Sequence, residues 1–239
     1  MALEKDDGCQ DCKETRQLEE ILARAEGLVF DCDGTILDTM PLYYETWKRS
    51  CNELELEFPE ERFLKLAGVP VKDIFQMLID EQHNDRTGAD KLSAEYCMEV
   101  KRKYMKELEQ EEKFAGPIDV VCDIIKKYHR SIPMAVASSG WRDHVLEGLE
   151  RNQLLSMFGG PKNVVTTCDE AVKNPKPAPD IFLVAAQRLG GQPEKCVGFE
   201  DGDHGMAAIR SANFLYACDV RLMHMYPRNV EKRRKEQEK

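Results

Sequence analysis

The sequence predicts an α/β protein with a doubly wound, Rossmann-like parallel sheet and an inserted α-helical cap domain. Three observations lead to this prediction. Short apolar runs alternate with amphipathic helical segments, one long stretch has helical patterns only, and acidic or hydroxyl side chains follow the apolar runs. Strands without apolar–polar alternation are typical of a parallel sheet that is covered on both faces. With 239 residues and 42% apolar content, the chain can form one large domain, or a domain with a smaller insertion.

Four short apolar runs are the predicted strands. They are Leu28–Phe30, Pro133–Ala137, Val164–Thr167 and Cys196–Phe199. The spacing of apolar residues predicts helices over Ile118–His129 and Val145–Leu155. A further helix is expected over Asp180–Leu189, because it begins with a residue that favours the N-cap and stops at Gly190. This alternation of strands and helices is typical of a doubly wound α/β domain.

The stretch from residue 41 to residue 114 has no strand pattern. One face of its first predicted helix carries Tyr43, Trp47, Cys51 and Leu54, and residues 71–79 and 93–108 supply further helices. The last residues form a charge run that we interpret as a solvated C-terminal helix. The predicted divisions are an N-terminal extension (1–26), a core (27–40 and 115–225), a helical cap (41–114) and a charged tail (226–239).

The composition excludes several classes of function. The formal net charge of −10 repels nucleic acid and anionic membranes, so we expect neither as a partner. The N-terminal residues are charged and lack the apolar core of a signal peptide, and no apolar run is long enough to span a bilayer. Nine scattered cysteines are typical of reduced thiols. We therefore predict a cytoplasmic protein, and nothing in the sequence indicates an obligate protein partner.

A C-x-x-C pair, Cys9 and Cys12, lies near the N-terminus. No second pair and no histidine follow at zinc-binding spacing, and no strand precedes the pair. We therefore predict no metal or redox site there.

Two aspartates, Asp31 and Asp33, directly follow the first apolar run in GLVFDCDGTILDT. Their like charges repel each other, so a cation is expected beside them. A calcium-binding EF-hand loop also begins with two acids, but it needs Gly at its sixth position and Glu at its twelfth. This chain has Ile36 and Leu42 at those positions, and its Asp pair follows a predicted strand instead of a helix. The EF-hand interpretation therefore fails.

Each predicted strand leads to side chains that can take part in catalysis. In a doubly wound sheet, ligands bind beyond the carboxyl ends of the strands, so these side chains should meet at one place. In chain order, the four strands lead to Asp31 and Asp33, to Ser138 and Ser139, to Lys176, and to Glu200 and Asp201.

This set of side chains suits phosphoryl transfer, which needs a nucleophile, a bound Mg²⁺ and donors around the phosphate oxygens. Mg²⁺ prefers oxygen ligands, which Asp31 and Asp201 would supply. A carboxylate can also attack phosphorus and form an acyl phosphate, so Asp31 can both bind the metal and act as nucleophile. Asp33 is then available to protonate the leaving oxygen and later to activate water.

The stretches DCDGTILDT, AVASSG, KPAPDIF and GFEDGDHG resemble, in this order, the four motifs of the haloacid dehalogenase-like hydrolase superfamily. The helical insertion after the first motif resembles the cap of its β-phosphoglucomutase-like group. Within that group, the amino-acid sequences of the motifs are most similar to those of sugar-phosphate phosphatases of the fructose-1-phosphate phosphatase type. The resemblance covers residues 27–222.

The resemblance implies a role for each candidate residue. Asp31 would be the nucleophile, and Asp33 the acid/base, with its backbone carbonyl also on Mg²⁺. Asp201 would bind the metal directly, and Glu200 would act in the same metal site. The remaining implied roles are phosphate binding by Ser138, by the backbone amide of Ser139 and by Lys176, and substrate contact by Thr39.

Two cap positions depart from the pattern of the phosphomutases in this group. Those enzymes carry a His and an Arg that grip a second phosphate, whereas this chain has Tyr43 and Val71 at the corresponding positions. The missing positive charge favours net hydrolysis. We therefore predict a Mg²⁺-dependent phosphatase that hydrolyses a small sugar or polyol phosphate through an aspartyl-phosphate. The alternatives are a sugar phosphomutase and a catalytically silent phosphate-binding regulator.

Overall fold

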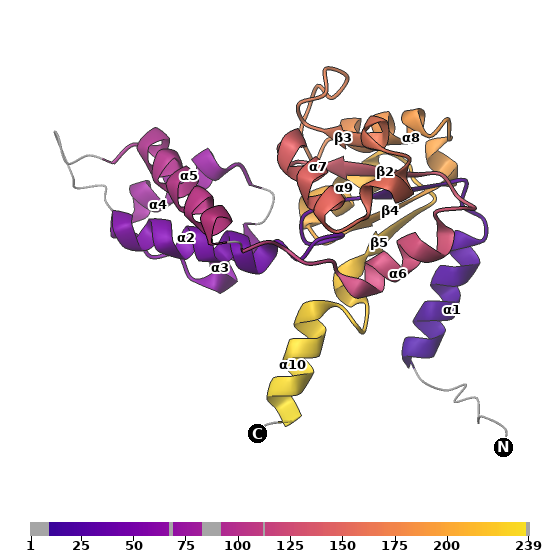
Figure 1. Cartoon of the computed structure of the whole chain (residues 1–239), viewed down its shortest axis with the longest axis horizontal. Helices are drawn as coiled ribbons and strands as arrows, with labels where there is room; N and C mark the ends of the chain where they lie inside the picture. Colours follow the sequence, from indigo (N-terminus) through magenta and orange to yellow (C-terminus); the bar gives the residue numbers. More distant parts are fainter. Residues whose placement is uncertain (1–9, 67–68, 83–91, 112, 238–239) are drawn as a thin grey trace. The chain divides into compact units, whose positions relative to one another are not determined.

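The computed structural model describes residues 10–66, 69–82, 92–111 and 113–237. The chain divides into two compact units, Met1–Ile36 with Pro117–Lys239, and Leu37–Gly116. We call the first the core unit, because it contains the sheet, and the second the cap unit (Figure 1). Cys9 and the side chain of Cys12 lie outside the described residues, so the interpretation of their C-x-x-C pair stays a prediction.

A five-stranded parallel sheet forms the centre of the core unit, in the strand order β3-β2-β1-β4-β5. β1 lies in the middle, with Phe30 opposite Val136 of β2 and opposite Phe199 of β4. The predicted α/β class with a parallel sheet is confirmed. The strands are β1 (Gly27–Phe30), β2 (Met134–Ser138), β3 (Val164–Thr166), β4 (Cys196–Glu200) and β5 (Tyr216–Asp219).

β5 is a strand that the apolar pattern did not predict. It lies at the edge of the sheet, Tyr216 is 38% exposed, and among its four residues only Cys218 is buried. An edge strand needs no continuous apolar run, because part of it faces solvent. Three helices also have no counterpart among the predictions, namely α1 (Gln10–Leu22), α3 (Glu60–Lys65) and α9 (Asp203–Ser211). The predicted C-terminal helix in the charge run is present as α10 (Pro227–Gln237).

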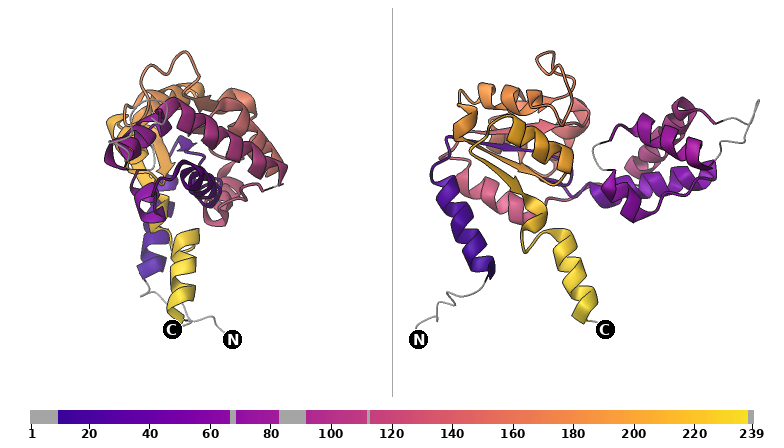
Figure 2. Two further views of the ribbon diagram at one scale, coloured as in Figure 1. Left: turned by 90° about the vertical axis from the view of Figure 1, so that its left-hand side faces the viewer. Right: turned by 180° about the vertical axis from the view of Figure 1, so that it is seen from behind.

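Helices cover both faces of the sheet. α8 (Asp180–Arg188) and α9 pack Phe182 and Ile209 against Val29 and Ala135 in one buried cluster. α7 (Arg142–Arg151) lies on the other side of the sheet from α9, as the front and rear views show (Figures 1 and 2). α6 (Asp119–Tyr128) matches the first predicted core helix within one residue at each end. The doubly wound arrangement explains why β1 and β2 are buried along their whole length.

The cap unit is helical in its described residues. Its helices are α2 (Met40–Leu54), α3, α4 (Val71–Gln82) and α5 (Ala94–Gln110). Trp47 lies at its centre, with ring centroids 4.8 Å from Phe58 and 4.6 Å from Phe75. The predicted apolar face of α2 is therefore the face that packs, since Trp47, Cys51 and Leu54 are all buried.

The two chain segments that connect the units are paired by backbone hydrogen bonds within each unit. In the core unit the Ile118 amide donates to the Ile36 carbonyl at 2.8 Å, and in the cap unit the Asp38 amide donates to the Gly116 carbonyl at 2.9 Å. The insertion therefore begins and ends at points that lie next to each other in space. Among the described residues, no helix has the length and apolar character needed to cross a bilayer.

Candidate active site

The carboxyl end of β1 places Asp31 at the centre of the candidate site. Its side chain is buried, and its amide donates to the Phe199 carbonyl at 2.9 Å, which extends the pairing of β1 with β4 by one residue. Lys176 reaches this point from the loop before α8. Its Nζ lies 2.6 Å from Asp31 Oδ1 and 2.8 Å from Glu200 Oε2, and all three side chains are at least 92% shielded from solvent.

Three buried carboxylates surround this single lysine. Asp31, Glu200 and Asp201 offer ligand oxygens that all lie within 4.8 Å of one another. Burial raises the pKa of Asp31 well above its ordinary value, the charge of Glu200 adds to this rise, and Lys176 opposes it. Burial, with a further contribution from Glu200, likewise raises the pKa of Asp201 to about 7. The cluster is therefore short of positive charge.

A hard divalent cation fits this cluster. The donors are all oxygen atoms, and they are close enough together to share one ion. Burial by itself would lower the pKa of Lys176, but the charges of Asp31 and Glu200 outweigh it and raise that pKa, so the lysine stays charged. One ammonium leaves the three carboxylates with an excess of negative charge, which Mg²⁺ would compensate.

Glu200 also shapes the loop after β4. Its Oε1 accepts hydrogen bonds from the amides of Asp201, at 3.1 Å, and Gly202, at 2.9 Å. Its Oε2 accepts from Lys176, so both oxygens are engaged. There is no room for a side chain at Gly205, because a Cβ there would overlap the Glu200 carboxylate. Glu200 therefore fixes both the lysine and the turn that carries Asp201.

The turn after β1 closes against Asp201. Gly34 has φ +85°, and a Cβ at this position would overlap the Asp201 carboxylate, so only glycine fits. The next residue, Thr35, is fully buried and donates from Oγ1 to Asp201 Oδ1 at 3.2 Å. Thr35 is a site residue that was not predicted from the sequence. The signal was its place in the D-x-D-G-T turn, since a buried threonine beside acids needs a partner for its hydroxyl.

Asp33 lies on the β2 side of the site. Ser138 Oγ donates to Asp33 Oδ2 in a long hydrogen bond of 3.4 Å and accepts from the Gly140 amide at 2.9 Å. The Asp33 carboxylate is not one of the three that cluster among the described residues. The two aspartates of the D-x-D pair thus face different neighbours, Asp31 toward lysine and acids, and Asp33 toward the β2 loop.

Ser139 and Thr39 are the remaining predicted residues. Ser139 is exposed, and its carbonyl accepts a hydrogen bond of 3.4 Å from Thr167 Oγ1. Thr39 belongs to the cap unit, where it precedes α2. Its hydroxyl is buried and has no hydrogen-bond partner among the described residues. Each of these two roles stays a prediction.

The cap unit contains a shielded cation, Lys101, that was not predicted from the sequence. The ammonium of Lys101 on α5 lies over two aromatic rings, 5.3 Å from the ring centre of Trp47 and 5.9 Å from that of Tyr43. Burial lowers the pKa of Lys101 to about 8. It forms no ion pair with a described residue, which is unusual for a shielded lysine. Its position four residues after Cys97, on the apolar side of α5, was the signal in the sequence.

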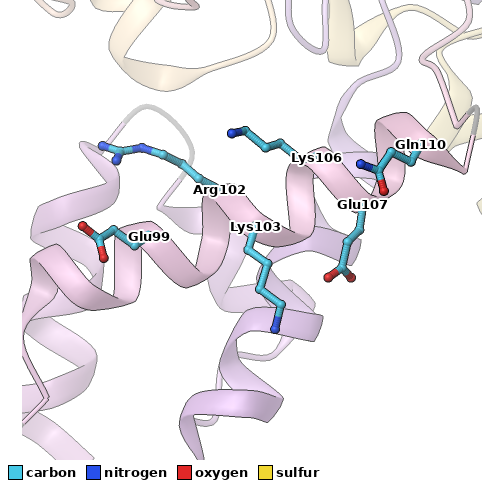
Figure 3. Close-up of a pocket in the computed structure, with 6 residues that line it drawn as sticks. All are labelled: Glu99, Arg102, Lys103, Lys106, Glu107 and Gln110. Atoms are coloured by element: carbon cyan, nitrogen blue, oxygen red, sulfur yellow. The ribbon is translucent and has the colours of Figure 1, made fainter.

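The opposite side of α5 carries a charged surface hollow of about 480 Å³ (Figure 3). It is lined by Glu99, Arg102, Lys103, Lys106, Glu107 and Gln110. The lining contains both acids and bases, and Lys103 already pairs with Glu53 at 2.8 Å. The hollow contains none of the candidate catalytic residues, so we assign it no part in the site.

The sequence pattern of the haloacid dehalogenase-like hydrolases matches residues 28–218 of this chain. The chain belongs to the haloacid dehalogenase-like hydrolase family. The matched segment runs from β1 into β5 and includes every candidate site residue named above. The resemblance inferred from the four motifs is thereby confirmed.

Several curated members of the family are phosphatases. Fructose-1-phosphate phosphatase YqaB of Escherichia coli is 36% identical over 200 residues, which cover 84% of this chain and 98% of that protein. A phosphorylated carbohydrates phosphatase of Thermotoga maritima is 29% identical and covers 78% of this chain and 81% of its own. The predicted class, a phosphoric monoester hydrolase of this family, is confirmed by these relatives.

The family also includes phosphomutases. Beta-phosphoglucomutase of Bacillus subtilis is 26% identical over 200 residues, covering 82% of this chain and 83% of that protein. The crystal structure of beta-phosphoglucomutase from Clostridium difficile has a TM-score of 0.61 at 21% identity, and covers 81% of this chain and 84% of its own. At that identity the structural likeness supports the hydrolase fold and its helical cap.

Proposed function

We propose that this hydrolase is a Mg²⁺-dependent phosphatase of a small sugar or polyol phosphate, and that it works through an aspartyl-phosphate on Asp31. One observation carries the proposal. The Lys176 ammonium bridges Asp31 and Glu200 in a site shielded from water, beside Asp201. A nucleophilic carboxylate, a fixed positive charge and a cluster of metal-binding oxygens are the groups that phosphoryl transfer requires.

Asp31 and Lys176 act in the first step. The Asp31 carboxylate attacks phosphorus, a new P–O bond forms, and the bond between phosphorus and the sugar oxygen breaks. Lys176 offsets the negative charge of the attacking carboxylate and of the incoming phosphate, which would otherwise repel each other. Because the ammonium is held by Glu200 as well, it stays in place while Asp31 reacts.

Asp33 is the proposed proton carrier. It donates a proton to the departing sugar oxygen, and in the second step it takes a proton from the water that attacks the aspartyl-phosphate, which releases phosphate and restores Asp31. Its carboxylate lies beside Ser138 and the Gly140 loop, apart from the acidic cluster. This separation supports a role in proton transfer instead of metal binding through the carboxylate.

Asp31 and Asp201, with Glu200, would hold Mg²⁺, and the Asp33 carbonyl is the further ligand that the family resemblance implies. When bound, the ion supplies neutralisation of the carboxylates and of the phosphate. Thr35 keeps Asp201 oriented through its hydroxyl. Ser138, the Ser139 amide and Lys176 are the groups that we propose donate hydrogen bonds to the phosphate.

The proposed substrate class rests on the relatives and on the cap. The first two relatives described above are named for fructose 1-phosphate and phosphorylated carbohydrates. In the cap unit, Lys101 offers a cation, which suits a polar, hydroxyl-rich ligand. The Thr39 hydroxyl, buried without a partner among the described residues, is a further candidate for substrate contact.

A sugar phosphomutase is the alternative, and Lys101 is the observation that favours it. Tyr43 and Val71 lack the charge that would grip a second phosphate, but the Lys101 ammonium lies 5.9 Å from the Tyr43 ring centre and could replace it. Conversion of one sugar phosphate into an isomer without free phosphate would select the mutase. A catalytically silent regulator is disfavoured, because Asp31, Asp33, Lys176 and Asp201 are all present.

Release of inorganic phosphate from a panel of phosphorylated metabolites, fructose 1-phosphate included, tests the proposal. We expect turnover with Mg²⁺, loss of turnover with EDTA, and loss with Asp31→Asn. The matched control is Asp143→Asn, at an exposed aspartate in the first turn of α7. Turnover that survives both EDTA and Asp31→Asn would refute the mechanism, and a panel without any phosphate release would refute the function.

A further inference from the structure

Tyr226 lies beyond residues 28–218, which the family pattern matches, and it has no part in the mechanism above. Its side chain is 2% exposed, although it follows the last strand and precedes the charged helix α10. Its hydroxyl donates to the carbonyl of Gly34 at 2.8 Å, so it contacts the turn that carries Asp31 and Asp33. A C-terminal residue is thus bonded to the catalytic turn.

The Gly34 carbonyl is a sensitive point of that turn. It belongs to the same peptide unit as the Thr35 amide, which donates to the Cys32 carbonyl at 3.3 Å. A hydrogen bond to this carbonyl therefore holds the orientation of the Gly34–Thr35 peptide plane. The side chain of the same residue, Thr35, donates a hydrogen bond from Oγ1 to Asp201 Oδ1 at 3.2 Å. Gly34 is thus in contact with both residues, since Tyr226 bonds its carbonyl and the Asp201 carboxylate leaves no room for a Cβ on it.

The segment that carries Tyr226 is itself firmly held. Asn229 Nδ2 donates to the carbonyls of Arg221, at 2.8 Å, and Met223, at 2.9 Å. The Arg221 guanidinium in turn donates to Asp203 Oδ1 at 2.8 Å, two residues after Asp201. The segment is therefore bonded near both acidic turns of the site. A fixed donor can impose a geometry on the turn, whereas a mobile one could not.

We propose that Tyr226 is a positioning residue for phosphoryl transfer, and that its hydroxyl holds the Gly34–Thr35 peptide so that Thr35 stays on Asp201 and the Asp31 turn keeps its reactive form. This inference rests on the proposed function, because it acts through Asp31 and Asp201. Without the hydroxyl, the buried Gly34 carbonyl loses its donor, and the peptide is free to turn away.

The test compares the full-length protein with Tyr226→Phe, which keeps the buried ring and removes only the hydroxyl. The matched control is Tyr216→Phe, which removes a hydroxyl from the partly exposed edge strand β5. We expect Tyr226→Phe to lower kcat by about fivefold to tenfold and to leave KM within about twofold. Amide hydrogen exchange, followed by mass spectrometry, should become faster in residues 31–36 and stay unchanged in β2.

Three outcomes would overturn the proposal. The first is a kcat and a 31–36 exchange rate that both match the control, and the second is a lower kcat without faster exchange in 31–36. The third is faster exchange throughout the core unit, which would mean a general structural role. If the unaltered protein releases no phosphate from any tested metabolite, the proposed function fails, whereas the exchange measurement still decides whether Tyr226 holds the turn.

Discussion

Lys176 Nζ lies 2.6 Å from Asp31 Oδ1, although 145 positions of the chain separate the two residues. The contact exists because β1 is the central strand and because the loop between β3 and α8 returns to its carboxyl end. The ring of Phe182, with its centroid 5.0 Å from the ammonium, covers the lysine from the α8 side. The nucleophile and its countercharge are thus held together by the fold and not by local sequence.

Replacement of Lys176 by Met should lower kcat by about 10²- to 10³-fold, since one fixed charge that stabilises the transition state is lost. Purified variants should be compared at saturating Mg²⁺ in a phosphate-release assay. Lys173→Met is the matched control, because Lys173 lies in the same loop but is exposed. Equal activity of the two variants would show that the bridge to Asp31 and Glu200 plays no part in turnover.

The unfolding free energy of the metal-free protein should fall as pH rises, because Asp201 loses its proton. Its pKa is raised from an ordinary value of 3.8 to about 7 in the folded state, so folding is favoured while the carboxyl is protonated, and that contribution is lost between about pH 4 and pH 7. Compared with Asp201→Asn, the native protein should lose up to about 4 kcal/mol of unfolding free energy across this window. Thermal or urea unfolding at several pH values measures the difference.

Added Mg²⁺ should offset this loss, and its stabilising effect should be larger at pH 8 than at pH 5, where protons compete for the same oxygens. Asp201→Asn should respond little to Mg²⁺ at either pH. A stability difference between the native protein and Asp201→Asn that stays constant from pH 4 to pH 8 would contradict the expected titration.

Gly34→Ala should destabilise the protein by about 2–4 kcal/mol, because alanine is strained at φ +85° and its Cβ would overlap the Asp201 carboxylate. Phosphatase activity should fall with it, since Asp201 must move. Gly116→Ala is the control, as no atom lies within 4 Å of a Cβ built there. Denaturant unfolding checks the prediction, and two variants of equal stability would exclude the tight contact.

Lys101→Met should raise KM by about tenfold and change kcat little, because the cap cation is proposed to bind substrate and not to take part in the chemistry. The folded protein should be at least as stable as before, since a shielded charge without an ion-pair partner among the described residues is replaced by an apolar side chain. Lys106→Met, on the exposed side of α5, is the control. An unchanged KM for the tested sugar phosphates would remove Lys101 from the substrate site.

Residues at the ends of buried strands were predictable from the sequence. Asp31, Ser138 and Glu200 each follow or end a wholly apolar run, and a parallel sheet necessarily brings such ends to one edge. Lys176 was found in the same way, through the segment that follows the third run. The structure brings Asp31, Lys176, Glu200 and Asp201 together, while their catalytic roles stay predictions.

The contacts that were missed have no local signature. β5 is an edge strand without an apolar run, and Tyr226 reaches Gly34 across 192 positions of the chain. Lys101 is one charged residue on an otherwise apolar helix face, where its partners are rings from another helix. Each depends on tertiary packing, which a pattern of neighbouring residues does not encode.

The paired connections at Ile36–Ile118 and Asp38–Gly116 have a consequence for how this hydrolase could diversify. The polypeptide leaves the core unit and returns to it through two segments that are hydrogen-bonded to each other. We therefore expect that the helical insertion can be replaced as a whole. A graft that joins a different insert at Leu37 and Gly116 would keep the strands and the acidic cluster intact. The substrate specificity would then change with the insertion alone, while the residues that carry out phosphoryl transfer stay the same.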